Sequence, residues 1–245
     1  IAHGEKLLED GADILDIGGE SSRPGSDYVD AEQEISRVVP LIRRIRRESQ
    51  IPISVDTRKA AVARAALDAG ANVVNDISAL RDDPELGALV AQSGVPVILM
   101  HMQGTPASMQ RDPTYGDVVA DVAGFLLERA RACEAAGIPK DRLLLDPGFG
   151  FGKNLAHNLE LLAGLPRLAG LGFPILVGIS RKSMLGRLTG RDVGERLAAS
   201  LAAAVLAVER GARVVRAHDP GETRDALRVA WAVRETAARR GPSAH

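Results

Sequence analysis

The chain has 245 residues and a formal net charge of −1, and 45% of its residues are hydrophobic. The nearly balanced charge and the lack of any run of about 18 apolar residues argue against a nucleic acid or a membrane as a partner. The single cysteine, Cys133, excludes an internal disulfide framework and, with a start that lacks the pattern of a signal peptide, predicts a cytoplasmic protein.

Short apolar runs alternate with amphipathic helical patterns along the whole chain. The chain opens with the pattern of a helix end at residues 5–11, and residues 31–49 and 59–70 are typical of whole helices. Seven apolar runs predict strands, at residues 12–19, 52–57, 72–77, 96–101, 143–147, 174–180 and 213–219. Most helical patterns stop at a glycine, as helices commonly do. The regular alternation predicts a parallel sheet covered by helices.

Seven strand–helix units that follow an orphan helix predict a (β/α)₈ TIM barrel, as a single domain over residues 1–245. Its first strand is then expected upstream of residue 1. A doubly wound open sheet is the alternative. That fold would need a glycine-rich nucleotide motif after its first strand, and residues 16–25 lack the G-x-G-x-x-G spacing.

Polar side chains interrupt or follow the apolar runs at their carboxyl ends. In chain order they are Asp16, Glu20, Asp56, Asn75, Asp76, His101, Asp146, Ser180, Arg181, Lys182, Arg216 and His218. The carboxyl ends of barrel strands meet at one rim, so many of these side chains should share a pocket. Because side chains alternate along a strand, only one of Asn75 and Asp76 can face it, and we choose Asn75.

Several of these residues also have a purely structural interpretation. Asp56 could cap the following helix, Asp146 could belong to a turn, and Asp16 could bond to neighbouring strands. His101 at a strand end is more often structural than catalytic. Lys182 is harder to explain in this way, because a cation at a helix N-terminus opposes the helix dipole unless an anion binds there.

As a set, the acceptors of Asp56 and Asp146 and the amide of Asn75 suit a planar ring with an amino-amidine edge. Lys182 at the same rim can donate to a ring carbonyl or nitrogen. For the neighbouring Arg181 we expect only an ion pair at the surface.

The last predicted strand is followed by Arg216 and His218. Phosphate sites of barrels commonly lie near the seventh and eighth strands, so this pair predicts an anion site. Two long connections, at residues 20–33 and 102–116, also follow strand ends, where barrel loops usually serve function.

Seven motifs carry a specific resemblance to a known family. They are "DIGGESSRPG", "SVDTRK", "NDIS", "LMHMQG", "LDPGFGFGK", "GISRKS" and "VRAHD". They occur in the order and spacing of dihydropteroate synthase, over residues 12–219. The resemblance implies a (β/α)₈ fold, a homodimer, and an Mg²⁺-assisted reaction. That reaction joins 4-aminobenzoate to 6-hydroxymethyl-7,8-dihydropterin diphosphate and releases diphosphate.

The resemblance also implies roles for individual residues. The implied pterin-binding residues are Asp56, Asn75, Met100, Asp146, Phe151, Gly178 and Lys182. The implied aminobenzoate site comprises Ser22, Arg23, Pro24 and Ser183, of which the first three lie in a mobile loop. The implied diphosphate-binding residues are Ser22, Arg216 and His218. The catalytic residues are then Asp146, Lys182, Arg216 and His218, and none forms a covalent bond to substrate.

The sequence departs from the family pattern at three places. Ser22 stands where Thr is more common, which keeps the hydroxyl, and "VRAHDP" replaces "VRVHDV" but keeps Arg216 and His218. A family segment resembling "LNVTPDSFSDGG" does not occur, so the metal-binding Asn is expected upstream of residue 1.

Three other functions remain open. A pterin-dependent methyltransferase of the same superfamily would have no diphosphate to hold. An aldolase would form a Schiff base at Lys182, which needs a lysine of lowered pKa. A pterin-binding homologue without catalysis would need no metal ligand.

Overall fold

The computed structural model describes residues 2–240, in which helices and strands alternate. The strands are β1 (Leu15–Gly18), β2 (Ile53–Asp56), β3 (Val73–Asp76), β4 (Val97–Met100), β5 (Leu143–Asp146), β6 (Leu176–Val177) and β7 (Val214–Val215). The helices are α1 (Ala2–Glu9), α2 (Ala31–Glu48), α3 (Ala60–Asp68), α4 (Pro84–Ser93), α5 (Val118–Ala135), α6 (Leu155–Ala163), α7 (Leu165–Ala169), α8 (Ser183–Thr189), α9 (Leu197–Glu209) and α10 (Pro220–Arg240). Two short 3₁₀ helices are η1 (Lys140–Arg142) and η2 (Val193–Glu195). Each strand lies within one of the predicted apolar runs.

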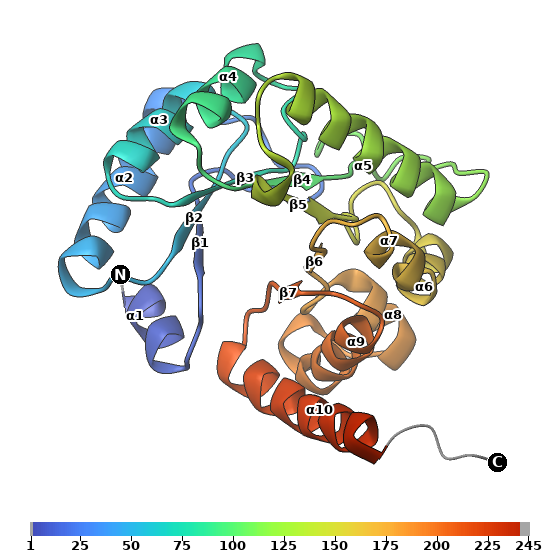
Figure 1. Cartoon of the computed structure of the whole chain (residues 1–245). Coiled ribbons are helices and arrows are strands. Elements are labelled where there is room, and N and C mark those ends of the chain that lie inside the picture. Colours follow the sequence, from blue (N-terminus) through green and yellow to red (C-terminus); the bar gives the residue numbers. More distant parts are fainter. Residues whose placement is uncertain (1, 241–245) are drawn as a thin grey trace.

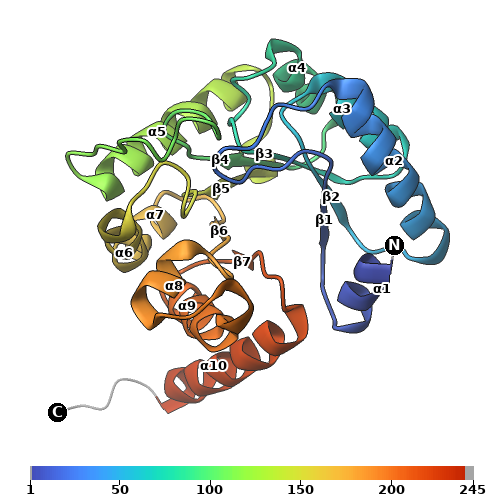
Figure 2. The same cartoon turned by 180° about the vertical axis from the view of Figure 1, so that it is seen from behind.

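The strands follow one another around the fold in chain order. β1 to β5 form one parallel sheet, β6 pairs with β7 in parallel, and a bridge between Leu145 and Ile175 joins the two groups. Helices lie outside this curved row of strands (Figures 1 and 2). This succession confirms the barrel prediction. A doubly wound sheet would reverse its strand order at a switch point, so that alternative prediction is wrong. The first strand of the barrel, predicted upstream of residue 1, lies outside the described residues.

Side-chain caps and glycines set the helix ends. The carboxylates of Asp30, Asp83 and Asp117 accept hydrogen bonds from backbone N–H groups in the first turns of α2, α4 and α5. Gly94 and Gly190 end α4 and α8 with φ values of 66° and 70°, which favour glycine. None of the helices between residues 2 and 240 is long and apolar enough to span a membrane.

The core lies between the strands and the helices and consists mainly of aliphatic side chains. Val55, Val74 and Leu99 from the strands are fully buried, and they belong to one cluster with Ile42 of α2 and Leu126 of α5. Full burial of such a side chain contributes about 1.5–3 kcal/mol of transfer free energy. This layer fixes the strands, and the strands fix the polar residues at their carboxyl ends.

Candidate active site

The carboxyl ends of the parallel strands bring the predicted site residues to one rim. Asp56 pairs in register with Asn75, and Met100 pairs with Asp146. Lys182 follows β6, which pairs with β7. Because these strands run in the same direction, their ends lie on the same face of the barrel.

Asp16 of β1 connects three strands at this rim. Its Oδ2 atom accepts hydrogen bonds from Nε of Arg216 at 2.6 Å and from Nδ2 of Asn75 at 3.3 Å. Nη2 of Arg216 also lies 3.8 Å from Oδ2 of Asp56. The other carboxylate oxygen of Asp16 is buried and has no hydrogen-bond partner among the described residues. Arg216 therefore lies between the carboxylates of two neighbouring strands.

Alternation along β3 separates the functions of two adjacent polar residues. Asn75 turns toward Asp16, whereas the carboxylate of Asp76 accepts hydrogen bonds from the backbone N–H groups of Ser78 and Leu80, each at 2.7 Å. Asn75 therefore belongs to the rim, and Asp76 holds the loop that follows the strand.

Burial and charge shape the titration of this group. Burial raises the pKa of the Asp56 carboxyl, the charge of Asp16 raises it further, and Arg216 opposes the rise. Burial acts to lower the pKa of Arg216, but the carboxylates of Asp16 and Asp56 outweigh it. The Arg216 side chain is 50% exposed, so its guanidinium can face both these carboxylates and an anion from solvent.

The loop after β5 connects Asp146 with Lys182. Oδ1 of Asp146 accepts a hydrogen bond from the backbone N–H of Gly148 at 2.7 Å. Nζ of Lys182 donates to the backbone carbonyl of Phe149 and lies 4.8 Å from the centre of the Phe151 ring. The loop thus holds a carboxylate, an ammonium group and an aromatic face together.

Asp146 and Lys182 shift each other's titration. Burial raises the pKa of Asp146, and the charge of Lys182 opposes that rise. Burial lowers the pKa of Lys182 to about 8, and Asp146 opposes the fall. Lys182 therefore keeps its proton at neutral pH but loses it more readily than an exposed lysine.

An apolar patch and a glycine border the polar groups. The patch consists of Ile77, Met100, Met102, Met109 and Phe151. A Cβ atom at Gly178 would lie 3.7 Å from Cβ of Arg216 and 4.0 Å from Nζ of Lys182. A larger side chain at this position would fill the space between the two cations, so glycine leaves room for a ligand there.

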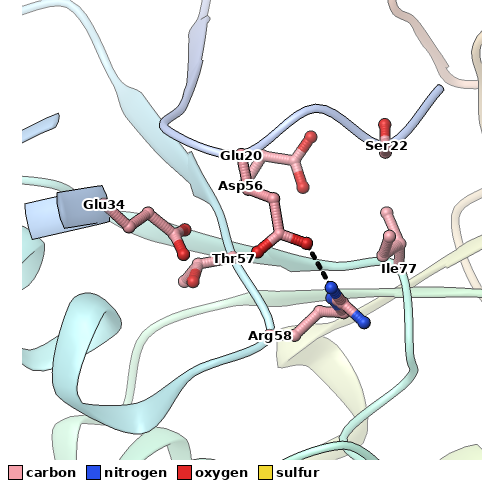
Figure 3. A pocket seen from close by; sticks show the side chains of 7 residues that line it. All are labelled: Glu20, Ser22, Glu34, Asp56, Thr57, Arg58 and Ile77. Atoms are coloured by element: carbon pink, nitrogen blue, oxygen red, sulfur yellow. Dashed lines mark hydrogen bonds and ion pairs between the residues drawn. The ribbon is translucent and has the colours of Figure 1, made fainter. Parts of the chain in front are cut away.

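A small hollow lies at the base of the loop after β1 (Figure 3). It is lined by Glu20, Ser22, Glu34, Asp56, Thr57, Arg58 and Ile77. The dashed line in Figure 3 marks the buried ion pair between Arg58 and Glu20. Nζ of Lys59 also pairs with Glu20 and lies 2.7 Å from Oε2 of Glu34. Buried ion pairs therefore fix the start of this loop.

The loop itself contacts the loop that follows β4. Ser22 is half-buried, whereas Arg23 and Pro24 are exposed. The backbone N–H of Gly25 donates to the carbonyl of Pro106, in the loop after β4, at 3.1 Å. Burial and neighbouring arginines lower the pKa of His218, and Arg23 is one of these arginines.

His218 and Arg181 each have a defined partner. Nδ1 of His218 lies 3.1 Å from Oγ of Ser180. Nε of Arg181 donates to Oδ2 of Asp219 at 3.0 Å, so the predicted ion pair of Arg181 is present. Ser183 is exposed and begins α8 directly after the lysine of the rim.

Sequence reasoning does not select all the charged residues that support this rim. It leaves Asp16 as a possible strand residue, although a carboxylate inside an apolar run is a signal for a buried polar role. It also passes over Lys153 and the pair of Arg58 and Lys59. Their burial cannot be read from loop sequence, because loops have no period that distinguishes inner from outer side chains.

Among residues 2–240, no group of three or more His, Cys, Asp or Glu side chains could hold a metal ion.

Comparison with known proteins gives consistent relationships. Residues 1–218 match the family described as pterin binding enzyme. The dihydropteroate synthase of Escherichia coli strain K12 is 48% identical over 94% of this chain and 81% of its own length. The structure of Yersinia pestis dihydropteroate synthase with a sulfonamide drug has a TM-score of 0.93 at 46% identity, over 96% of this chain and 85% of that one. The structure of Xanthomonas albilineans dihydropteroate synthase with 4-aminobenzoic acid has a TM-score of 0.91 at 53% identity, over 95% and 83%.

Proposed function

This chain belongs to the dihydropteroate synthase family of pterin-binding enzymes, and we propose that it joins 4-aminobenzoate to 6-hydroxymethyl-7,8-dihydropterin diphosphate. The bond between the pterin methylene carbon and the diphosphate oxygen breaks. A bond between that carbon and the amine nitrogen forms. The products are 7,8-dihydropteroate, diphosphate and a proton, so the enzyme is a transferase.

One observation carries this proposal beyond the family relationship. The rim holds two cations in different surroundings: Arg216 lies between two carboxylates with half of its side chain exposed, and Lys182 lies against the loop of Asp146. The exposed guanidinium suits an anionic leaving group, and the partly buried ammonium suits a ring carbonyl. A substrate with a ring at one end and a diphosphate at the other matches both.

We assign the ring to the inner part of the rim. The carboxylates of Asp56 and Asp146 can accept from the amino-amidine edge of a pterin, and the amide of Asn75 and the ammonium of Lys182 can donate to it. The apolar patch around Met100 supplies a flat wall on which a ring can lie.

Charge develops on both sides of the bond that breaks. Loss of diphosphate leaves a positive charge delocalised over the dihydropterin, which the carboxylate of Asp146 can stabilise. Arg216 can stabilise the negative charge on the leaving group. Because burial and nearby arginines lower the pKa of His218, this side chain would serve as a neutral N–H donor to the diphosphate.

We place the aminobenzoate between the Ser22–Pro24 loop and Ser183. The loop starts at a fixed base of ion pairs and ends in exposed residues, as expected for a segment that closes over a substrate. Closure would keep water away from the cationic intermediate and so favour attack by the amine.

Mg²⁺ remains part of the proposal. Magnesium sites with phosphates use few protein carboxylates and several oxygen atoms of phosphate and water. A magnesium ion would neutralise charge on the diphosphate. No step above depends on it.

Other functions of the same barrel predict different results. Mass spectrometry of the products formed from both substrates should find 7,8-dihydropteroate. Binding of the pterin without product would favour the non-catalytic homologue, and methyl transfer to a corrinoid would favour the methyltransferase. Trapping of a carbonyl substrate on Lys182 by borohydride would favour the aldolase.

A homodimer and a cytoplasmic location belong to the proposal as well. Large apolar side chains are exposed on α9 and α10, namely Leu206, Val229, Trp231 and Val233. Exposed apolar side chains of this kind support association with a second copy of the chain. Light scattering measures the mass in solution, and Trp231→Glu should favour the monomer. The cytoplasmic location is supported by the single cysteine, Cys133.

A further inference from the structure

Lys153 is a buried lysine without a carboxylate in hydrogen-bond contact. Only 3% of the residue is exposed. Its Nζ atom lies 2.9 Å from Nδ1 of His101 and donates to the carbonyl oxygens of Gly148 and Phe151, each at 3.0 Å. A buried ammonium group is costly unless its donors are satisfied, and here three neutral acceptors surround it. Two of them belong to the loop after β5.

The loop after β5 is pressed against the chain after β4. Gly148 and Gly152 have φ values of 68° and 61°. A Cβ atom at Gly148 would lie 1.9 Å from the carbonyl oxygen of His101, and one at Gly152 would lie 2.7 Å from that of Gln103. No larger residue fits at these contacts without movement of the backbone. The ammonium group of Lys153 joins the two segments at this contact.

The same loop carries the partners of the ring site. Its Gly148 N–H donates to Asp146, its Phe149 carbonyl accepts from Lys182, and its Phe151 ring lies against the same lysine. A shift of this loop would therefore displace a carboxylate, an ammonium group and an aromatic ring of the site together.

We propose that Lys153 is a positioning residue, which sets the geometry of the pterin site by tying the loop after β5 to His101. This inference rests on the proposed function, because the ligand is the dihydropterin diphosphate. Lys153 is not proposed to touch the substrate. It acts through Asp146 and Lys182.

The protonation of His101 fits such a role. Burial lowers the pKa of His101 to about 2, and the charge of Lys153 contributes, so the imidazole is neutral and its Nδ1 can accept from Lys153. Burial lowers the pKa of Lys153 to about 7, Asp146 opposes the fall, and Lys182 adds to it. Tyr115 also lies nearby, with its ring centre 6.0 Å from Nζ of Lys153.

Lys153→Met tests the role, because it keeps an unbranched side chain and removes the three hydrogen bonds. Lys140→Met is the matched control, since Lys140 is an exposed lysine that lies over the ring of Phe173. We expect the Kd of dihydropterin diphosphate, measured by calorimetry, to rise about tenfold or more in Lys153→Met. The Lys140→Met variant should bind like the wild type.

A double-mutant cycle distinguishes a role of Lys153 in positioning Asp146 from general damage to the fold. If Lys153 acts through Asp146, then Lys153→Met should change the Kd much less in an Asp146→Asn background than in the wild type. A merely structural role would weaken binding by the same factor in both backgrounds. Equal factors, or an unchanged Kd in Lys153→Met, would overturn the inference.

His101→Leu gives a second route if Lys153→Met does not fold. It leaves Lys153 in place and removes one acceptor, so the Kd should rise by a smaller factor in the same direction. An unchanged Kd in a folded His101→Leu variant would also count against the inference. The wild type serves as the reference throughout. If the wild type binds no dihydropterin diphosphate, the proposed function fails. If the wild type binds it and the variants bind it with the same Kd, only the role of Lys153 is refuted.

Discussion

The Nε atom of Arg216 lies 2.6 Å from Oδ2 of Asp16, so the first and last of the described strands are joined at the rim. The same guanidinium faces Asp56 at 3.8 Å. Two partly buried carboxylates are thereby held beside one cation that is half open to solvent. We regard this arrangement as the link between the ring site and the diphosphate site.

Replacement of Arg216 by alanine should lower kcat/KM by about 100-fold or more, because both the anion contact and the neutralisation of two carboxylates are lost. Steady-state kinetics with both substrates measures the effect. Arg213→Ala is the matched control, since Arg213 is an exposed arginine just before β7. Equal kinetics of the two variants would contradict the role of Arg216.

Replacement of Asp146 by asparagine should lower kcat by about 100- to 1,000-fold, because the carboxylate that faces the developing positive charge is lost. The amide oxygen can still accept from the N–H of Gly148, so the thermal midpoint should change little. Asp141→Asn, in the exposed η1 helix, is the control. Normal turnover by Asp146→Asn would show that the assignment is wrong.

The sequence predicts the strands well, because each strand lies within a short run rich in apolar residues between two helical patterns. Alternation predicts that only one of Asn75 and Asp76 faces the rim, and the hydrogen bond from Asn75 to Asp16 agrees with the choice of Asn75. It does not predict that Asp16 is the common partner of Arg216 and Asn75, since strand pairing around the barrel brings together residues that are 200 positions apart. The burial of Lys153 depends on contact between two loops and leaves no pattern in either.

Pterin binding should weaken as the pH rises through about 8, because burial lowers the pKa of Lys182 to about 8 and only the protonated form carries the charge. Calorimetric titrations between about pH 6 and pH 9.5 measure this fall in affinity. Lys182→Arg should bind the pterin more weakly, but its affinity should not fall as the pH rises, since a guanidinium stays protonated over this range. If the affinity of Lys182→Arg falls with the same midpoint pH, Lys182 is not the group whose titration weakens binding.

Replacement of Glu20 by glutamine should lower the free energy of unfolding by about 3 kcal/mol, because it removes the nearest carboxylate of the buried Arg58 and Lys59 cations and leaves Arg58 only Asp82, at 3.7 Å. Urea denaturation measures the change. Glu48→Gln, in an exposed pair with Arg44, should cost less than about 1 kcal/mol. Similar losses in both variants would contradict a special role for the buried pair.

The stabilisation that Glu20 provides should change with pH in a definite direction. Burial acts to raise the pKa of Glu20, but Lys59 and Arg58 outweigh it, so the pKa in the folded protein lies below its ordinary value. The stabilisation is then present above the unfolded pKa and is lost as the pH falls through the folded pKa. The difference between wild type and Glu20→Gln should therefore shrink in acid, and a difference that grows would contradict this cause.

The most direct test of the proposed function is diphosphate release by the full-length protein from dihydropterin diphosphate. We predict release that requires 4-aminobenzoate, is increased by Mg²⁺, and is matched mole for mole by 7,8-dihydropteroate. No release under these conditions, or release at the same rate without 4-aminobenzoate, would contradict the account.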